Sequence, residues 1–301
     1  MIIIICGPTA SGKSAIALKI AKKYQGEILN GDAFQVYQEL SIGTAKPTIL
    51  ERSLLPHHLY DYVKPNEPFS VQRYQKEARE KIDEILARKH VPILVGGTGL
   101  YQKATIFDYV FEDQIEVDMS AFDSYENEAL YEMAKEIDPV AVMKIHPNNR
   151  KRLLRVLEIY YASGKKKSEH EALQKHASIY ENVVWIGVDI PRDELYQRID
   201  SRVDQMMKEG LLEEVKQLYQ KYSSSIQAFQ AIGYKEWIPY FEEKVDRDSV
   251  VELIKKNSRN YAKRQMTFFK NQLPVKWFQT EEELILYVDQ IMKGEMKHGE
   301  N

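Results

Sequence analysis

The segment from residue 7 to residue 14 has the residue types and spacing of a phosphate-binding loop. In order, it contains Gly7, Pro8, Thr9, Ala10, Ser11, Gly12, Lys13 and Ser14. This order fits the pattern G-x-x-x-x-G-K-[ST], whose glycines let successive backbone N–H groups turn toward phosphate oxygens. The Lys adds a positive charge, the Ser hydroxyl can bind magnesium, and the start of the following helix adds a favourable dipole. The pattern therefore predicts a phosphorylated ligand.

The segments around this loop have the periodicity that the motif requires. Residues 2–6 form an unbroken apolar run typical of a buried strand, and residues 14–24 carry apolar positions at helical spacing. Further buried strands are indicated at residues 27–30, 91–95 and 183–190. Unbroken apolar strands separated by helical stretches predict an α/β fold of the P-loop NTPase type, a parallel sheet with helices on both faces.

The predicted strands are interrupted by a segment of helical pattern. Residues 112–180 contain no comparable apolar run, so we expect a helical insertion domain there. The core domain would then consist of residues 1–111 and 181–301. After the last strand, amphipathic helices are expected at residues 192–209, 211–222 and 249–270.

Composition narrows the class of protein. Hydrophobic residues make up 44% and charged residues 29% of the chain, and no run approaches the roughly 18 apolar residues of a membrane span. We therefore expect a soluble protein without a membrane partner. The single cysteine, Cys6, excludes an internal disulfide and a cysteine-cluster metal site, which suits the cytoplasm.

The net charge of −3 hides a segregation of charge along the chain. Acidic residues dominate from residue 112 to residue 138. The following segment contains one acidic residue, Glu158, and a cluster of basic residues: Lys144, Arg150, Lys151, Arg152, Arg155, Lys165, Lys166 and Lys167. A second basic set recurs at helical spacing between residues 255 and 264. A polyanionic partner is therefore compatible with the acidic total.

A phosphate-binding loop identifies a ligand class but not a reaction. An NTPase, a small-molecule kinase, a diphosphate-dependent transferase and a nucleotide-dependent RNA-binding protein all remain open at this point. NTPases usually carry an acidic residue at the end of a second core strand. The strand at residues 91–95 is followed instead by Gly96, Gly97 and Thr98, which weakens the NTPase interpretation.

Segments along most of the chain closely resemble the tRNA dimethylallyltransferase family. In chain order they are residues 7–14, 31–37 (GDAFQVY), 42–47 (IGTAKP), 57–61 (HHLYD), 96–101 (GGTGLY), 146–158 (HPNNRKRLLRVLE), 198–213, 231–234 (AIGY) and 261–265 (YAKRQ). The resemblance implies a cytoplasmic, monomeric enzyme that uses Mg²⁺. It would transfer a dimethylallyl group from dimethylallyl diphosphate to N6 of adenosine 37, in the anticodon stem-loop of tRNA, and release diphosphate.

The resemblance also implies roles for individual residues. Asp32 matches the Asp that accepts a hydrogen bond from the adenine amine and deprotonates it, although a helix cap or a water-mediated magnesium contact is the alternative. Thr98 matches a Thr that positions the reacting groups, with a turn residue beside glycines as the alternative. Arg202 matches an arginine that reaches the donor diphosphate, beside Lys13, and guanidinium suits that task, with an exposed helix arginine as the alternative.

Two segments are expected to contact the tRNA. The first contains Asp32, Ala33, Phe34 and Gln35, although the family often has Ser where this chain has Ala33, and Phe34 is equally suited to core packing. The second contains Lys151, Arg152, Leu153, Leu154 and Arg155. Arg152 and Arg155 are three residues apart and share a helix face, which suits RNA phosphates, with a solvated helix face as the alternative.

Overall fold

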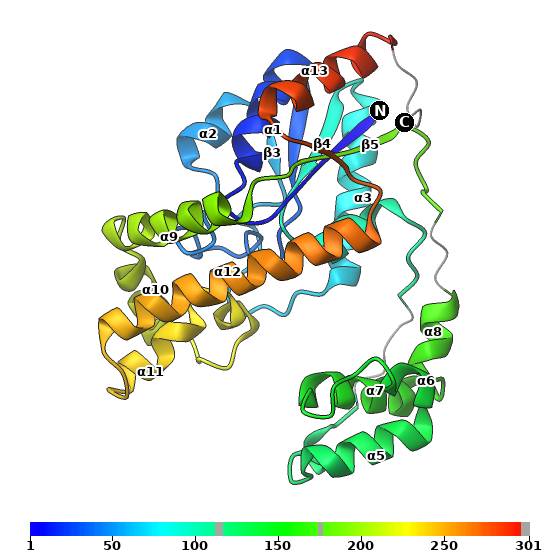
Figure 1. The fold of residues 1–301 in the computed structure, drawn as a ribbon, viewed down its shortest axis with the longest axis vertical. Coiled ribbons are helices and arrows are strands. Elements are labelled where there is room, and N and C mark those ends of the chain that lie inside the picture. The colour runs from blue at the N-terminus through cyan, green and yellow to red at the C-terminus, as the bar shows by residue number, and fades with distance from the viewer. Residues whose placement is uncertain (112–116, 174–176, 296–301) are drawn as a thin grey trace. The chain divides into compact units, whose positions relative to one another are not determined.

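The computed structural model describes residues 1–111, 117–173 and 177–295. The chain divides into two compact units. One contains Met1–Ile106 and Tyr180–Asn301, and the other contains Phe107–Ile179. Figure 1 shows that the sheet belongs to the first unit, whereas the second carries α5 to α8.

The first unit is built on a six-stranded sheet in which the paired strands are parallel. In spatial order its strands are β3 (His57–His58), β2 (Gly26–Asn30), β4 (Val91–Val95), β1 (Ile2–Cys6), β5 (Val183–Val188) and β6 (Lys276–Phe278). The central strand, β1, pairs Ile3 with Ile93 on one side and with Val184 on the other. The predicted parallel α/β fold is confirmed.

Helices cover the sheet because its strands are apolar on both faces. On one face, α1 (Lys13–Lys23) and α13 (Glu281–Met292) share a buried cluster with residues of β1, β2, β4 and β5. Elsewhere α3 (Val71–Ala87) packs against β4 and against α4 (Gly99–Ile106). The short helix α2 (Ile49–Leu54) begins at a Thr48 capping box and precedes β3.

A second set of helices in the same unit forms a separate core beyond the carboxyl ends of the strands. Here α9 (Arg192–Lys208) lies beside α12 (Arg247–Gln272), and α10 (Leu211–Lys221) packs against α9 (Figure 1). The short α11 (Ile238–Phe241) follows the fully buried Trp237. The predicted helices at residues 192–209, 211–222 and 249–270 are confirmed within two residues at each end.

The second unit is helical in its described part, with its own small core. It contains α5 (Asn127–Ile137), α6 (Pro139–Val142), α7 (Arg150–Ser163) and α8 (Lys167–Leu173). Leu130, Val156 and Leu157 are fully buried there. The Asp138 carboxylate accepts the backbone N–H groups of Ala141 (3.0 Å) and Ser168 (2.7 Å), which joins α6 to the start of α8.

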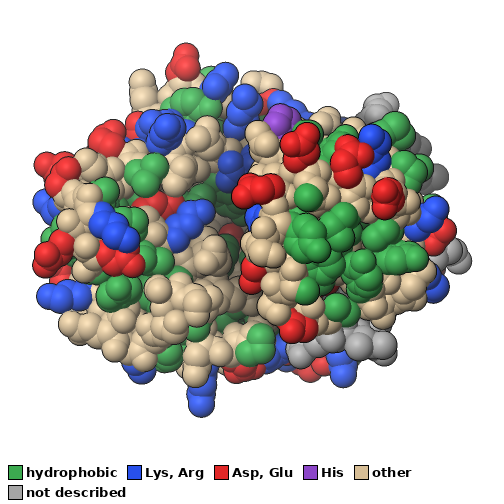
Figure 2. Space-filling model, turned by 90° about the horizontal axis from the view of Figure 1, so that it is seen from below, with side chains coloured by type: hydrophobic (Ala, Val, Ile, Leu, Met, Phe, Trp, Pro, Cys, Tyr) green, Lys and Arg blue, Asp and Glu red, His purple; other side chains and the backbone are tan. Residues whose placement is uncertain are grey.

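The surface mixes charges of both signs with scattered hydrophobic side chains, some of which gather into a patch in the view of Figure 2. Exposed apolar residues are common on soluble proteins and carry no argument alone. Within the described residues, no helix is both long enough and apolar enough to cross a membrane.

Candidate active site

The candidate site lies where three parallel strands end. The phosphate-binding loop follows β1, the segment with Asp32 follows β2, and Thr98 follows β4. Since β1 lies beside β4, and β4 beside β2, these three loops meet at one edge of the sheet. They line a single pocket together with α9, α12 and the segments 43–45 and 230–235.

The backbone of the phosphate-binding loop has a conformation that only some residue types adopt easily. Gly12 has φ +83° at the N-cap of α1, a left-handed conformation that glycine adopts without a steric cost. The loop is also tight at Gly7, where a Cβ atom would lie 2.9 Å from the Ser11 Oγ. The loop therefore wraps closely around the start of α1.

Lys13 points into this loop and is poised to receive an anion. Its Nζ donates to the Pro8 carbonyl oxygen at 2.5 Å and lies 3.5 Å from the Ser11 Oγ. Burial, together with the nearby positive charge of Arg202, lowers the pKa of Lys13 to about 7, although the Asp32 carboxylate opposes the change. A bound diphosphate would favour the charged form of Lys13.

Asp32 is held in a fixed orientation by its own segment. Its backbone N–H donates to the Asn30 Oδ1 at 2.8 Å, and its Oδ1 accepts the Phe34 N–H at 2.9 Å. The residues that follow form a turn, so Asp32 does not cap a helix. Burial raises the pKa of Asp32, against the opposing effects of the Phe34 N–H group and the Lys13 charge. A carboxylate with a raised pKa is a better proton acceptor.

Thr98 connects the loops that follow β2 and β4. Its Oγ1 accepts the Ala33 N–H at 3.1 Å, and its own N–H donates to the Gly31 carbonyl oxygen at 3.2 Å. Thr98 thus fixes the backbone on both sides of Asp32.

Arg202 comes from α9 and lines the pocket beside Lys13 and Ser14. Its guanidinium lies 3.4 Å from the Thr9 Oγ1, at the edge of the phosphate-binding loop. Burial lowers the pKa of Arg202, and the Asp32 carboxylate raises it. The structure therefore brings together predicted residues from three separate segments of the chain: Lys13 with Ser14, Asp32, and Arg202.

Phe34 and Gln35 line the same pocket. Phe34 also packs, half-buried, against a hydrophobic cluster, in line with core packing, and its contact with tRNA stays a prediction. The Gln35 Nε2 donates to the carbonyl oxygens of Thr44 (2.9 Å) and Ala45 (3.2 Å). That amide nitrogen is therefore engaged by the protein's own backbone.

The pocket also contains Tyr261 and Gln265 of α12, to which the sequence assigned no role, and Arg264 of the second basic set. The Gln265 Oε1 accepts the Thr9 N–H at 3.0 Å, and its Nε2 donates to the Gly97 carbonyl oxygen at 2.8 Å. Gln265 thereby joins the phosphate-binding loop to the loop after β4. The Arg264 guanidinium lies 5.6 Å from the centre of the Tyr261 ring. These residues belong to the segment 261–265, which resembles the family, but the sequence alone did not place that segment beside the phosphate-binding loop.

Part of the pocket wall is apolar. It includes side chains from α9 and α12, namely Ile199, Val203, Met206 and Ile254. A pocket that combines charged groups with aliphatic side chains suits a ligand with an anionic head and a hydrocarbon tail.

The predicted RNA-binding residues of the second unit lie on α7. Lys151 and Arg152 are exposed, whereas Leu153 is fully buried in that unit's core and Leu154 is half-buried. The Arg155 guanidinium forms an ion pair with Glu158 at 2.8 Å, in a partly exposed position. The side chains of Leu153 and Leu154 therefore serve packing, and the positive charge on this helix comes from Lys151, Arg152 and the partly exposed, ion-paired Arg155.

The second basic set is partly neutralised within the first unit. Lys255 forms an ion pair with Asp204 of α9 at 2.8 Å, and Arg259 forms one with Asp200 at 2.5 Å. These pairs join α12 to α9, so these two cations have a structural role.

Two oxygen donors that could serve a magnesium ion line the pocket. Across the described ranges, no group of three or more His, Cys, Asp or Glu side chains could hold a metal. Mg²⁺ is, however, commonly bound through one or two protein oxygens together with substrate phosphates and water. Ser14 and Asp32 both line the pocket and fit that kind of site.

The chain matches models of known protein families and several known proteins. The model of the family described as IPP transferase matches residues 35–272, and that of isopentenyl transferase matches residues 1–55. The chain is 46% identical to a tRNA dimethylallyltransferase of Anoxybacillus flavithermus, over 94% of this chain and 92% of the relative. A relative with the same name from Geobacillus thermodenitrificans is also 46% identical, with 92% and 90% covered.

Solved structures of similar proteins share the fold. The tRNA isopentenylpyrophosphate transferase of Bacillus halodurans is 41% identical, with a TM-score of 0.73 over 97% of this chain and 95% of that one. A eukaryotic dimethylallyltransferase, described as acting on tRNA, is 30% identical, with a TM-score of 0.81 over 97% and 79%. From the family match and these relatives, the chain belongs to the IPP transferase family and is a prenyltransferase.

Proposed function

We propose that this enzyme transfers a dimethylallyl group from dimethylallyl diphosphate to N6 of adenosine 37 in tRNA and releases diphosphate. The acceptor in this proposal follows the relatives, whose names specify tRNA. The observation that carries it is the convergence of Asp32, Lys13 and Arg202 in one pocket with an apolar wall. Such a pocket offers a cationic end for a diphosphate and a carboxylate for an amine proton.

The donor would bind with its diphosphate at the phosphate-binding loop. Lys13, Arg202 and the loop N–H groups would hold the anionic head, while Ile199, Val203 and Met206 would contact the hydrocarbon tail. As the bond between C1 and the bridging oxygen breaks, negative charge grows on the diphosphate. These fixed positive groups stabilise that charge in the transition state.

The acceptor amine would approach from the side of Asp32. A bond forms between N6 and C1 of the donor, the C1–O bond breaks, and one amine proton passes to an Asp32 carboxylate oxygen. Thr98 holds the backbone next to Asp32 through the Ala33 N–H, which keeps the carboxylate in place during this transfer. Prenylated RNA, diphosphate and one proton are the products.

Magnesium fits this scheme as a partner of the diphosphate. The Ser14 hydroxyl would hold it, and Asp32 could contact it through water. When bound, the ion would neutralise charge on the leaving diphosphate.

The proposal is tested by incubating the enzyme with radiolabelled dimethylallyl diphosphate, Mg²⁺ and unmodified tRNA. We expect label in the RNA, located at adenosine 37 after nuclease digestion. A transcript with guanosine at position 37 serves as the matched control and should remain unlabelled. Equal labelling of both transcripts would contradict the acceptor site. Labelling of free AMP, but not of tRNA, would contradict the acceptor class.

A further inference from the structure

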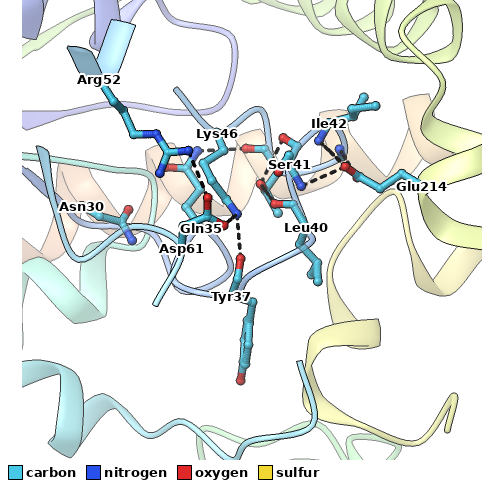
Figure 3. Close-up of polar contacts among 12 residues, drawn as sticks. Asn30, Gln35, Tyr37, Leu40, Ser41, Ile42, Lys46, Arg52, Asp61 and Glu214 are labelled. Carbon is cyan, nitrogen blue, oxygen red and sulfur yellow. Dashed lines mark hydrogen bonds and ion pairs between the residues drawn. The ribbon is translucent and has the colours of Figure 1, made fainter. Parts of the chain in front are cut away.

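A carboxylate outside the pocket joins two segments that form the pocket wall. Glu214, on α10, accepts the backbone N–H groups of Ser41 (3.0 Å), Ile42 (2.9 Å) and Gly43 (3.2 Å). Figure 3 shows the Glu214 carboxylate facing the N–H groups of Ser41 and Ile42. The Tyr234 hydroxyl donates to the same carboxylate at 2.6 Å.

Three consecutive N–H groups that point to one place form a backbone nest, a geometry that binds anions. In this protein the anion is the carboxylate of Glu214. Hydrogen bonds to an ionised acceptor are roughly twice as strong as bonds between neutral groups. Glu214 therefore holds the loop at residues 41–43 more firmly than a neutral side chain could.

Both segments that Glu214 holds reach the pocket. Gly43, Thr44 and Ala45 line it, and so do residues 230–233. The two are in tight contact, because a Cβ atom at Gly43 would lie 2.4 Å from the Tyr234 ring. The position of Tyr234, and through it the spacing of the two segments, thus depends on the carboxylate that both contact.

The same loop determines the position of Gln35. The Gln35 amide nitrogen donates to the Thr44 and Ala45 carbonyl oxygens, so a shift of residues 41–45 would move the Gln35 side chain in the pocket. The far end of the loop is fixed separately. There the buried Lys46 Nζ contacts the Tyr37 carbonyl oxygen at 2.6 Å and Asp61 at 2.5 Å (Figure 3).

We propose that Glu214 is a positioning residue for the acceptor nucleotide. By filling the nest at residues 41–43 and binding Tyr234, it sets the wall against which the acceptor base is placed. Its hydrogen bonds, in the part of the chain that the structure describes, go to these two segments and not to the phosphate-binding loop. Glu214 should therefore affect the acceptor and leave donor binding unchanged. The inference depends on the proposed function for the identity of the acceptor.

The first test compares Glu214→Gln with Glu213→Gln. Glu213 lies on the same turn of α10 and is exposed, so its replacement removes the same charge near the same helix start. In Glu214→Gln, one carboxylate oxygen becomes an NH₂ group that cannot accept the loop N–H groups. We expect kcat/KM for tRNA to fall at least tenfold in Glu214→Gln, with the dissociation constant of the donor within twofold of the parent. Glu213→Gln should match the parent in both.

Two further variants separate positioning from a general loss of structure. Tyr234→Phe removes one hydrogen bond to Glu214 and should lower kcat/KM for tRNA by a smaller factor, again without a change in donor affinity. Glu214→Ala empties the nest, and added formate should partly restore its tRNA kcat/KM, because the small carboxylate can occupy the same N–H groups. Formate should have no such effect on the parent.

The results that would overturn the inference are specific. Unchanged tRNA kcat/KM in Glu214→Gln, or an equal loss of donor affinity, would exclude an acceptor-specific role. A failure of the proposed function would give a different result, because the parent enzyme itself would then transfer no label to tRNA. Thermal melting of each variant shows whether it is folded, and Tyr234→Phe still decides the question if Glu214→Ala does not fold.

Discussion

Replacing Asp32 by Asn tests the central step of the proposed reaction. The adenine amine is a poor nucleophile because its lone pair is delocalised into the ring, so acceptance of its proton matters for the rate. Asn has the same size, and its Oδ1 can still accept the Phe34 N–H that now holds Asp32 at 2.9 Å. The loop should therefore keep its shape while the proton acceptor is lost.

The expected magnitude follows from the role of a positioned base. Such a base contributes about a hundredfold to ten-thousandfold in rate, or about 2.7 to 5.4 kcal/mol at about 1.36 kcal/mol per tenfold. Since burial raises the pKa of Asp32, its carboxylate is a stronger proton acceptor than an exposed one. The parent rate should rise with pH as Asp32 loses its proton, and Asp32→Asn should lose that rise.

The assay is a single-turnover measurement with saturating donor and tRNA, alongside both dissociation constants. Asp189→Asn is the matched control, because Asp189 follows β5 at the same edge of the sheet but forms a partly exposed ion pair with Lys270. We expect at least a hundredfold loss of rate for Asp32→Asn and no loss for Asp189→Asn. A rate within about threefold of the parent, roughly 0.7 kcal/mol, would refute the base assignment. Loss of magnesium-dependent donor binding would assign Asp32 to the metal instead.

Four further outcomes are expected. Lys13→Ala should abolish transfer and leave tRNA binding intact in a filter-binding assay, and an equal loss of RNA affinity would show that the two sites are not separate. The pKa of Lys13 is about 7 in the free enzyme, and a bound diphosphate favours its charged form. Donor binding should therefore take up nearly one proton per enzyme at pH 8, where free Lys13 is mostly neutral, and only a small fraction of a proton at pH 6, where it is already mostly charged. Calorimetry in buffers of different ionisation enthalpy measures this proton uptake. Donor affinity should also fall as pH rises above 7. A proton uptake that does not vary with pH, or that persists in Lys13→Ala, would be inconsistent with this reasoning. Replacing Arg152 and Arg155 by Ala should lower the salt dependence of tRNA binding by about one unit of slope for each lost phosphate contact, and an unchanged slope would indicate a solvated helix face. Phe229→Ala should lower the free energy of unfolding in urea by about 3 to 5 kcal/mol, since Phe229 is fully buried in the core beside α10, and a loss below about 1 kcal/mol would contradict that packing.

Strands β1, β4 and β5 could be predicted because burial on both faces of a parallel sheet favours nearly unbroken apolar runs, as in residues 2–6. Strand β2 (GEILN) is also buried but includes Glu27 and Asn30, and its prediction relied on the turn residues Gly31 and Asp32 that follow it. The edge strands were not predicted. His57–His58 and Lys276–Phe278 are two and three residues long and half-buried, so neither carries a periodic pattern. Pairing with β2 and β5 makes them strands.

The chemistry of individual loops was also available from the sequence. Lys13 lies within a contiguous motif, and Asp32 follows a recognisable strand, so local order alone places each of them at a strand end. Arg202 was assigned through family resemblance, because nothing in its local pattern separates it from an exposed helix arginine.

Only the tertiary structure decided which distant residues meet at the site. Gln265 reaches Thr9 across 256 positions of sequence, and Glu214 reaches Ile42 across 172. Hydrogen bonds of this kind form between side chains and backbone groups, whose N–H and C=O are the same in every residue other than proline and leave no mark in the sequence. Periodicity reports which face of an element is buried, but not which loop that element meets. The sequence therefore determined the interior strands of the sheet and the phosphate-binding loop, and the packing of α9, α10 and α12 determined the shape of the pocket.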